Sequence, residues 1–130
     1  MMSRIIIYTD GSCRPKNPGK GGWGFIALLQ ECEIHVNGGA EYTTNNVMEI
    51  TAVIEALREF DNIQKFLIYT DSQYVINCAQ GKWERKKNVE LWKKYDTYAQ
   101  GKDIIFEWVK AHNGDHYNEL VDKLAKEGSE

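Results

Sequence analysis

The chain has 130 residues, of which 42% are hydrophobic and 27% are charged, and its formal net charge is −3 at pH 7. This length suits one domain with its own core, and we expect residues 1–130 to form a single domain. The composition is that of an ordinary soluble globular protein, and no apolar run approaches the roughly 20 residues that span a bilayer, which excludes a membrane-spanning protein.

The first half of the chain predicts three strands followed by a helix. Arg4–Thr9 is rich in β-branched residues and leads into a loop with the sequence RPKNPGKGG. Gly22–Leu29 and Glu33–Gly39 are two more strands, close enough in sequence to pair antiparallel. Apolar residues then recur with helical period over Asn45–Phe60, and Thr44 or the first residue of the helix is the expected N-cap.

The second half alternates between strands and helices. Lys65–Thr70 is predicted as a buried strand, Ser72–Cys78 as a short helix and Asn88–Ala99 as a longer helix. Asp103–Val109 is the last strand, and Asp115–Glu127 is a closing helix with one apolar face. This order predicts an α/β fold in which helices cover a mixed sheet.

One segment of the chain is strongly basic. Between Lys82 and Lys94 there are six basic and two acidic residues, so this segment carries +4 while the remainder carries −7. Trp83 and Trp92 are interleaved with the lysines, a pattern that suits contact with nucleic-acid phosphates. The alternative is a solvated helix start whose tryptophans belong to the core.

Four carboxylates are candidates for a metal site. Asp10 and Asp71 share one context, an apolar run followed by Tyr-Thr-Asp and a small polar residue, which places both at the ends of strands. Each could instead serve locally, Asp10 in a turn and Asp71 as a helix cap. Glu49 lies at the rim of its helix's apolar face, within reach of the sheet edge, whereas Asp122 lies off the core face of the last helix.

The three cysteines indicate a reducing compartment. Cys13, Cys32 and Cys78 are odd in number and show no CxxC spacing, which favours free thiols over a disulfide framework or a zinc site. The N-terminal apolar run is short, is preceded by one basic residue and is interpreted as a strand, not a signal peptide. We expect a cytoplasmic protein, and a monomer, because no heptad seam is visible.

Four groups of motifs in register resemble type 1 ribonuclease H: TDGSC with NPG and GG, TTNNVMEI, YTDSQYV and WVKAHNGDHYNELVD. The resemblance runs from Ile5 to Leu124. It implies a ribonuclease H-like fold, a five-stranded mixed sheet whose first three strands are antiparallel, flanked by helices. It also implies cleavage of the RNA strand of RNA–DNA hybrids.

The resemblance assigns the catalytic set as Asp10, Glu49, Asp71, His112 and Asp122. The four acids would hold two Mg²⁺ ions, with Mn²⁺ as a possible substitute, for attack by water that leaves a 5′-phosphate and a 3′-hydroxyl. His112, near a glycine in a loop, would shuttle a proton or aid product release. A metal-free mechanism through the 2′-hydroxyl needs a paired base and acid, typically two histidines. Because His35 lies in a different strand, the four acids favour the metal mechanism instead.

The resemblance also implies six side chains that bind the hybrid duplex. They are Asn17, Asn45 and Gln73 for the RNA strand near the metals, Thr44 and Asn88 for a DNA-strand phosphate, and Trp83 for the DNA channel. Such amide and hydroxyl groups suit sugar and phosphate contacts without reading sequence. Helix capping is a second role that Thr44 and Asn45 can fill at the same time.

The chain departs from the family's bacterial members in two places. GKWERKKN is shorter than their basic helical protrusion, so we expect the basic charge without the extra helix, and weaker substrate affinity. The loop at residues 13–19 is about one residue longer, and no separate hybrid-binding domain is expected.

Three other functions remain open from sequence. They are another metal nuclease of this fold, such as an integrase or a proofreading exonuclease; a non-catalytic hybrid-binding module; and the nuclease domain of a retroelement reverse transcriptase. Asp10-Gly11-Ser12 lacks the Asp-x-Glu of proofreading enzymes, and all four acids are present, which argues against the first two.

Overall fold

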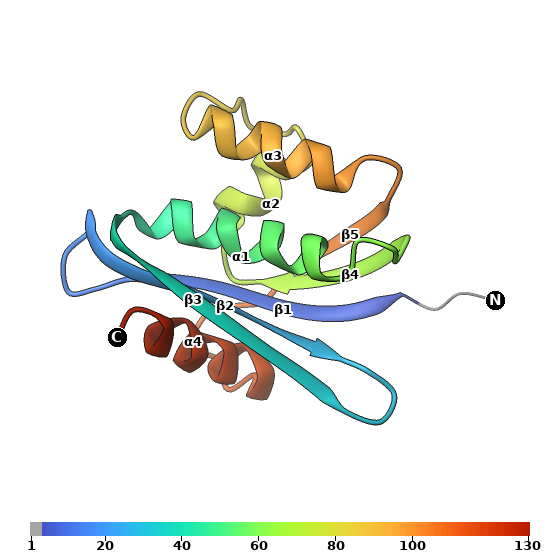
Figure 1. Ribbon diagram of the computed structural model, residues 1–130, viewed down its shortest axis with the longest axis horizontal. Coiled ribbons are helices and arrows are strands. Elements are labelled where there is room, and N and C mark those ends of the chain that lie inside the picture. The colour runs from blue at the N-terminus through green and yellow to red at the C-terminus, as the bar shows by residue number, and fades with distance from the viewer. Residues whose placement is uncertain (1–3) are drawn as a thin grey trace.

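The computed structural model describes residues 4–130, which form one five-stranded sheet and four helices (Figure 1). The elements in chain order are β1 (Ile5–Cys13), β2 (Gly19–Leu28), β3 (Glu33–Thr43), α1 (Asn45–Glu59), β4 (Lys65–Thr70), α2 (Gln73–Ala79), α3 (Val89–Ala99), β5 (Asp103–Trp108) and α4 (His116–Gly128). The strand order is β3-β2-β1-β4-β5; β1, β2 and β3 pair antiparallel, and β4 pairs parallel with both β1 and β5. The mixed sheet predicted from the family resemblance is therefore confirmed.

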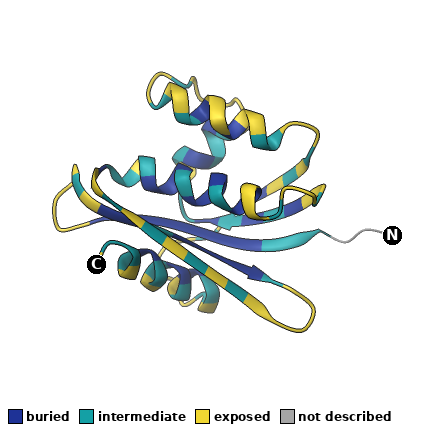
Figure 2. Cartoon of the chain, in the orientation of Figure 1, coloured by how far each residue is buried: buried dark blue, intermediate teal, exposed yellow. Residues whose placement is uncertain are grey.

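The sheet separates two hydrophobic clusters of unequal size, and Figure 2 shows buried residues along the strands and on the helices beside them. On one face α1, α2 and α3 cover the larger core, in which Ile7 and Phe25 pack against α1 residues such as Ile54. On the other face α4 alone covers a smaller cluster around Tyr8 and Val121. Successive side chains of a strand point to opposite faces, so β1 contributes to both clusters.

Three strands extend further than their sequence pattern predicts. β1 ends at Cys13 instead of Thr9, and β2 begins at Gly19 instead of Gly22, because the two strands stay paired through Asp10↔Gly24 to Cys13↔Gly21. β3 likewise continues to Thr43, with an irregularity in its ladder between Gly19 and Gly21. Glycine in a sequence often indicates a turn, but its backbone N–H and C=O groups can pair in a strand ladder like those of any other residue.

The basic segment contains no helix between α2 and α3, as predicted. Its two tryptophans differ: Trp92 is buried in the core, whereas Trp83 is 48% exposed. Arg85 is held within the fold, because its guanidinium donates to the Cys78 carbonyl at 2.8 Å and to Asp96 at 2.7 Å and lies 4.9 Å from the Trp92 ring centroid.

Across the described residues, no helix has both the length and the apolar character needed to cross a membrane.

Candidate active site

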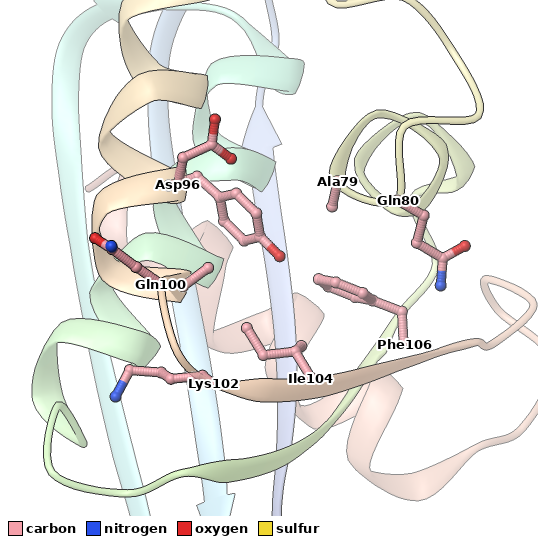
Figure 3. Close-up of a pocket in the computed structure, with 9 residues that line it drawn as sticks. Ala79, Gln80, Asp96, Gln100, Lys102, Ile104 and Phe106 are labelled. Carbon is pink, nitrogen blue, oxygen red and sulfur yellow. The ribbon is translucent and has the colours of Figure 1, made fainter.

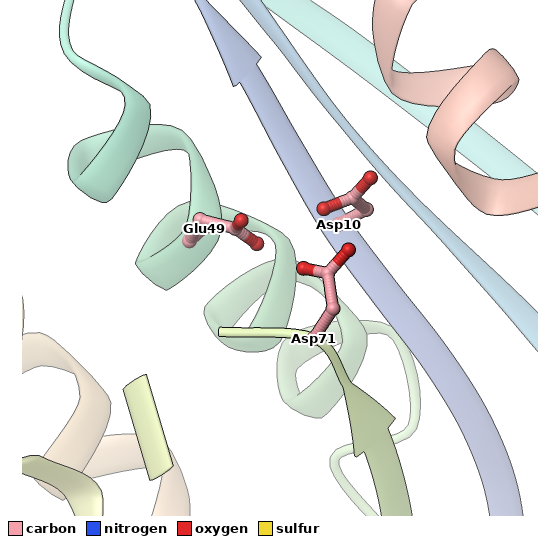
Figure 4. A group of neighbouring side chains, drawn as sticks. All are labelled: Asp10, Glu49 and Asp71. Carbon is pink, nitrogen blue, oxygen red and sulfur yellow. The ribbon is translucent and has the colours of Figure 1, made fainter. Parts of the chain in front are cut away.

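Three acidic side chains from separate elements converge at one place above the sheet. Asp10 comes from β1, Glu49 from α1 and Asp71 from the residue after β4, and Figure 4 shows their carboxylates directed toward one another. One carboxylate oxygen from each lies within 4.8 Å of the others. This spacing is compatible with joint coordination of a metal ion by oxygen ligands.

The strand pairing explains how Asp10 and Asp71 meet. β1 and β4 run parallel through Tyr8↔Tyr69, and each acid follows that last pair by two residues. The helix cap considered as an alternative role for Asp71 is supplied by Ser72, whose Oγ accepts from the Val75 N–H at 3.1 Å. Asp10 lies inside the β1–β2 ladder and not in a turn. Neither carboxylate is therefore committed to the local structural role that the sequence left open.

Gly11 allows α1 to approach β1 closely enough to bring Glu49 to Asp10. A Cβ at this position would lie 2.3 Å from the Glu49 backbone nitrogen and 2.4 Å from the Met48 carbonyl carbon. These distances are far below any real Cβ contact, so only glycine fits here without a shift of the helix. The helix register then directs Glu49 into the cluster.

Burial and mutual repulsion both disfavour the ionisation of these three carboxyl groups. Burial, the largest cause, raises the pKa of Asp10 and Glu49 well above their usual values and also raises the pKa of Asp71. Repulsion adds to this effect, from Asp71 on Asp10, from Asp10 on Glu49 and from Asp122 on Asp71. Nearby positive charge would favour the ionised form of such a cluster.

One carboxylate oxygen in the cluster is unsatisfied by protein groups. Glu49 is only 5% exposed, and its Oε1 has no hydrogen-bond partner within residues 4–130. A buried polar atom without a partner is costly. A hard divalent cation, which prefers oxygen ligands, would satisfy it, so the residues present fit a metal site.

The fourth predicted acid, Asp122, lies beside this cluster on α4. It is half-buried, and its Oδ2 accepts from Lys126 Nζ at 2.9 Å. Burial alone would raise the pKa of Asp122, but hydrogen bonds from Lys126 and Asp10 outweigh it and leave the pKa below its usual value. Asp122 is therefore the acid of the four that ionises most readily.

All four acids line one open cavity of about 340 Å³, together with His112, Asn45 and Gln73. A larger cavity of about 510 Å³ lies between α2, α3 and β5 (Figure 3). Its only acidic lining side chain is Asp96, which is paired with Arg85, so it lacks the carboxylate set. The chemistry of the molecule is therefore expected in the smaller cavity.

The other predicted substrate-binding residues lie outside the cavity lining. Asn17 Oδ1 accepts from the Asn45 N–H at 3.0 Å, which ties the β1–β2 loop to α1. Thr44 caps α1 by accepting from the Val47 N–H at 3.2 Å. Asn88 donates to the Tyr74 hydroxyl at 3.0 Å, and Trp83 is exposed on the basic segment. Their contacts with a nucleic acid remain predictions.

His112 enters the cavity from the loop between β5 and α4. It is exposed and adopts a left-handed backbone conformation, with φ of 56°. Asparagine, aspartate and histidine tolerate this conformation better than bulkier residues do. The imidazole therefore faces the acids from a solvent-accessible position.

Two residues near the acids were not identified from sequence. Asn118 on α4 is 3% exposed, and its side chain hydrogen-bonds Asp71, an effect that opposes the rise in the pKa of Asp71. It precedes Asp122 by four residues, so both lie on one face of α4, and that helical spacing was a usable signal. Arg14 also lines the cavity, and its position in a loop gave no such signal.

Comparisons with known proteins agree with this geometry. The RNase H family model matches residues 2–130. The chain is 43% identical to a ribonuclease H of Polynucleobacter asymbioticus, over 97% of this chain and 90% of that protein. It is 44% identical to a ribonuclease H of Wolbachia pipientis wMel, over 94% and 92%. The crystal structure of LC11-RNase H1 in complex with RNA/DNA hybrid is 26% identical, with a TM-score of 0.79, over 95% of this chain and 97% of that one.

Proposed function

We propose that this chain, which belongs to the ribonuclease H family and is a nuclease of RNA–DNA hybrids, hydrolyses the RNA strand with two divalent metal ions, Mg²⁺ with Mn²⁺ as a possible substitute. The products would carry 5′-phosphate and 3′-hydroxyl ends. The observation that carries this proposal is the cluster of buried Asp10 and Glu49 with half-buried Asp71, whose ligand oxygens lie within 4.8 Å of one another. We further propose that the chain acts as a single catalytic domain.

The four carboxylates would divide the task of holding the metals. Asp10, Glu49 and Asp71 supply converging oxygens, and Asp122 adds a ligand that ionises readily. Bound divalent ions would lower the pKa of the attacking water and stabilise charge on the phosphate and on the leaving 3′ oxygen. Without such ions the raised pKa values of the first three acids favour their protonated forms.

The protein's own groups would orient the substrate and move protons. Asn45 and Gln73 line the cavity and can donate amide hydrogen bonds to RNA sugar and phosphate groups. His112, exposed at the cavity edge, can carry a proton between the reacting groups and solvent. None of these groups needs to read base identity, which suits a nuclease that recognises duplex shape.

We also propose a cytoplasmic monomer. The cysteines are free, and Cys13 and Cys78 are buried as thiols, the state that a reducing compartment maintains. Light scattering of the purified protein tests the oligomeric state independently of activity.

The proposed function is tested by offering one labelled sequence as RNA–DNA hybrid, duplex RNA, duplex DNA and single-stranded RNA, each with Mg²⁺ and with chelator. Cutting of the RNA strand in the hybrid alone, only with metal and with 5′-phosphate ends, is the expected result. Metal-dependent cutting of duplex DNA, or hybrid binding without cutting, would overturn the proposal.

A further inference from the structure

Arg14 is the one permanently cationic side chain among the residues that line the acidic cavity. It lies just after β1, in the loop before β2, and it is exposed. Within residues 4–130 its guanidinium takes part in no ion pair and no side-chain hydrogen bond, although four carboxylates line the same cavity. By contrast, Arg4 and Arg85 are both engaged with aspartates at 2.7 Å. The Arg14 guanidinium is therefore free to bind a ligand.

The backbone around Arg14 is held in place on both sides. The Cys13 thiol donates toward the carbonyl oxygens of Lys16 at 3.1 Å and Thr43 at 3.4 Å. Three residues after Arg14, Asn17 Oδ1 accepts from the Asn45 N–H at 3.0 Å. The loop is thus anchored to the ends of β1 and β3 and to the start of α1. Its backbone needs little ordering when a ligand binds, which lowers the entropic cost of a contact made by Arg14.

The charge of the cavity indicates which ligand the guanidinium would bind. The acids repel a phosphate, and metal ions held by them would counter only part of that repulsion at neighbouring linkages. A guanidinium offers paired N–H donors that match two phosphate oxygens and keeps its charge at any working pH. Resting on the proposed function, we infer that Arg14 binds a phosphodiester of the RNA strand beside the bond that is cut, and so positions the substrate.

The first test compares binding of an RNA–DNA hybrid to the wild type, Arg14→Ala and Lys16→Ala in chelator, so that nothing is cut. Lys16 is the matched control, since it is exposed in the same loop but does not line the cavity. Arg14→Ala should weaken binding about tenfold, the loss expected for one charged hydrogen-bonding contact. The slope of log Kd against log salt should also fall by about 0.9, the value for one phosphate. Arg14→Lys should restore the slope but only part of the affinity.

The second test locates the phosphate with hybrids that each carry one uncharged methylphosphonate linkage in the RNA strand. At the contacted linkage the neutral group should weaken hybrid binding by the wild type and by Lys16→Ala. In Arg14→Ala the same linkage should cause no further loss of hybrid affinity. If no linkage shows this coupling while all variants melt at the wild-type temperature, the inference is wrong. Failure of the proposed function would look different, because the wild type itself would then not cut the hybrid.

Discussion

At the scale of single residues, the acidic cluster places catalysis and stability in opposition. Asp10 is 2% exposed, and its pKa is raised by burial and by the charges of Asp71 and Asp122. Keeping such a group ionised at neutral pH disfavours the folded state whenever no cation is bound. Under the proposed function, the folded protein retains this unfavourable charge cluster because the cluster would bind metal.

Asp10→Asn should separate these two effects. It should leave no detectable Mg²⁺-dependent cleavage of the hybrid and should raise the melting temperature of the metal-free protein, by about 4 °C for each kcal/mol of repulsion removed. Asp103→Asn is the control, since this acid is exposed and paired with Arg4 at 2.7 Å; it should keep full activity and melt slightly lower. Full cleavage by Asp10→Asn, or an unchanged melting temperature, would contradict the assignment.

His112→Ala should reduce kcat while leaving measurable activity. The imidazole lines the cavity from an exposed loop, so its loss removes a proton carrier but no metal ligand. A fall of about 10²-fold in kcat, with little change in KM, is expected for the loss of one general acid or base. Steady-state cleavage assays measure both constants. His116→Ala, an exposed neighbour that does not line the cavity, is the control, and equal kcat values for the two variants would exclude the role of His112.

At the scale of elements, the site depends on how closely helices approach the sheet. Gly11 allows α1 to approach the sheet closely, and Gly22 does the same for α4. A Cβ at Gly22 would lie 2.2 Å from the Ala125 carbonyl oxygen. The first contact places Glu49 and the second places the helix that carries Asp122. Two glycines in neighbouring strands thereby fix the positions of two acids that lie far apart in sequence.

Gly11→Ala should consequently harm both stability and metal binding. The added methyl group meets backbone atoms, so α1 must shift, at a cost of about 1–3 kcal/mol in the free energy of unfolding. Displacement of Glu49 should weaken Mg²⁺ binding, measured by calorimetric titration. Gly24→Ala is the matched control, because its nearest contacts are at 3.2 Å and include the flexible Leu124 side chain. Equal Mg²⁺ affinities in the two variants would show that α1 does not set the position of Glu49.

Sequence periodicity was sufficient for the type and order of every element, but not for their limits. Gly19 and Gly21 predict a loop and instead pair within β2, because ladder pairing depends on the partner strand. Asp10 and Asp71 could be proposed from their shared context and Glu49 from its place on its helix, whereas Asp122 was assigned by the family resemblance. The helical spacing of Asn118 from Asp122 was a usable signal for its face of α4, but its burial depends on how α4 packs against the sheet. The opening of Arg14 into the cavity depends likewise on how its loop packs, and no sequence pattern indicates it.

At the scale of the whole molecule, the positive charge of an otherwise acidic chain is concentrated in one segment. The segment from Lys82 to Lys94 carries +4 in a chain of net −3, yet Arg85 is committed to the fold through Asp96 and Trp92. Fewer cations therefore remain to attract phosphates than the sequence count implies. Under the proposed function, contacts inside the acidic cavity would then matter more for holding the substrate.

The acidic cluster predicts an unusual dependence of the free energy of unfolding on pH. The raised pKa values of Asp10, Glu49 and Asp71 mean that the folded state binds more protons than the unfolded state above the ordinary carboxyl range, near pH 4. The free energy of unfolding of the metal-free protein should then fall as pH rises from about 4 through these pKa values. The lowered pKa of Asp122 has the opposite sign, and its contribution is lost only as pH falls through the lowered value.

Mg²⁺ should reverse this trend, because it binds the ionised carboxylates of the folded state. At 100 times its Kd a ligand adds about 2.7 kcal/mol to the free energy of unfolding. Melting curves at pH 5 and pH 8, with Mg²⁺ and with chelator, should show a larger Mg²⁺-induced rise at pH 8, where more of the cluster is ionised. In Asp10→Asn both the decline with pH and the Mg²⁺ response should shrink. A metal-free protein whose melting temperature climbs steadily to pH 8 would show that the acids do not repel one another as the structure indicates.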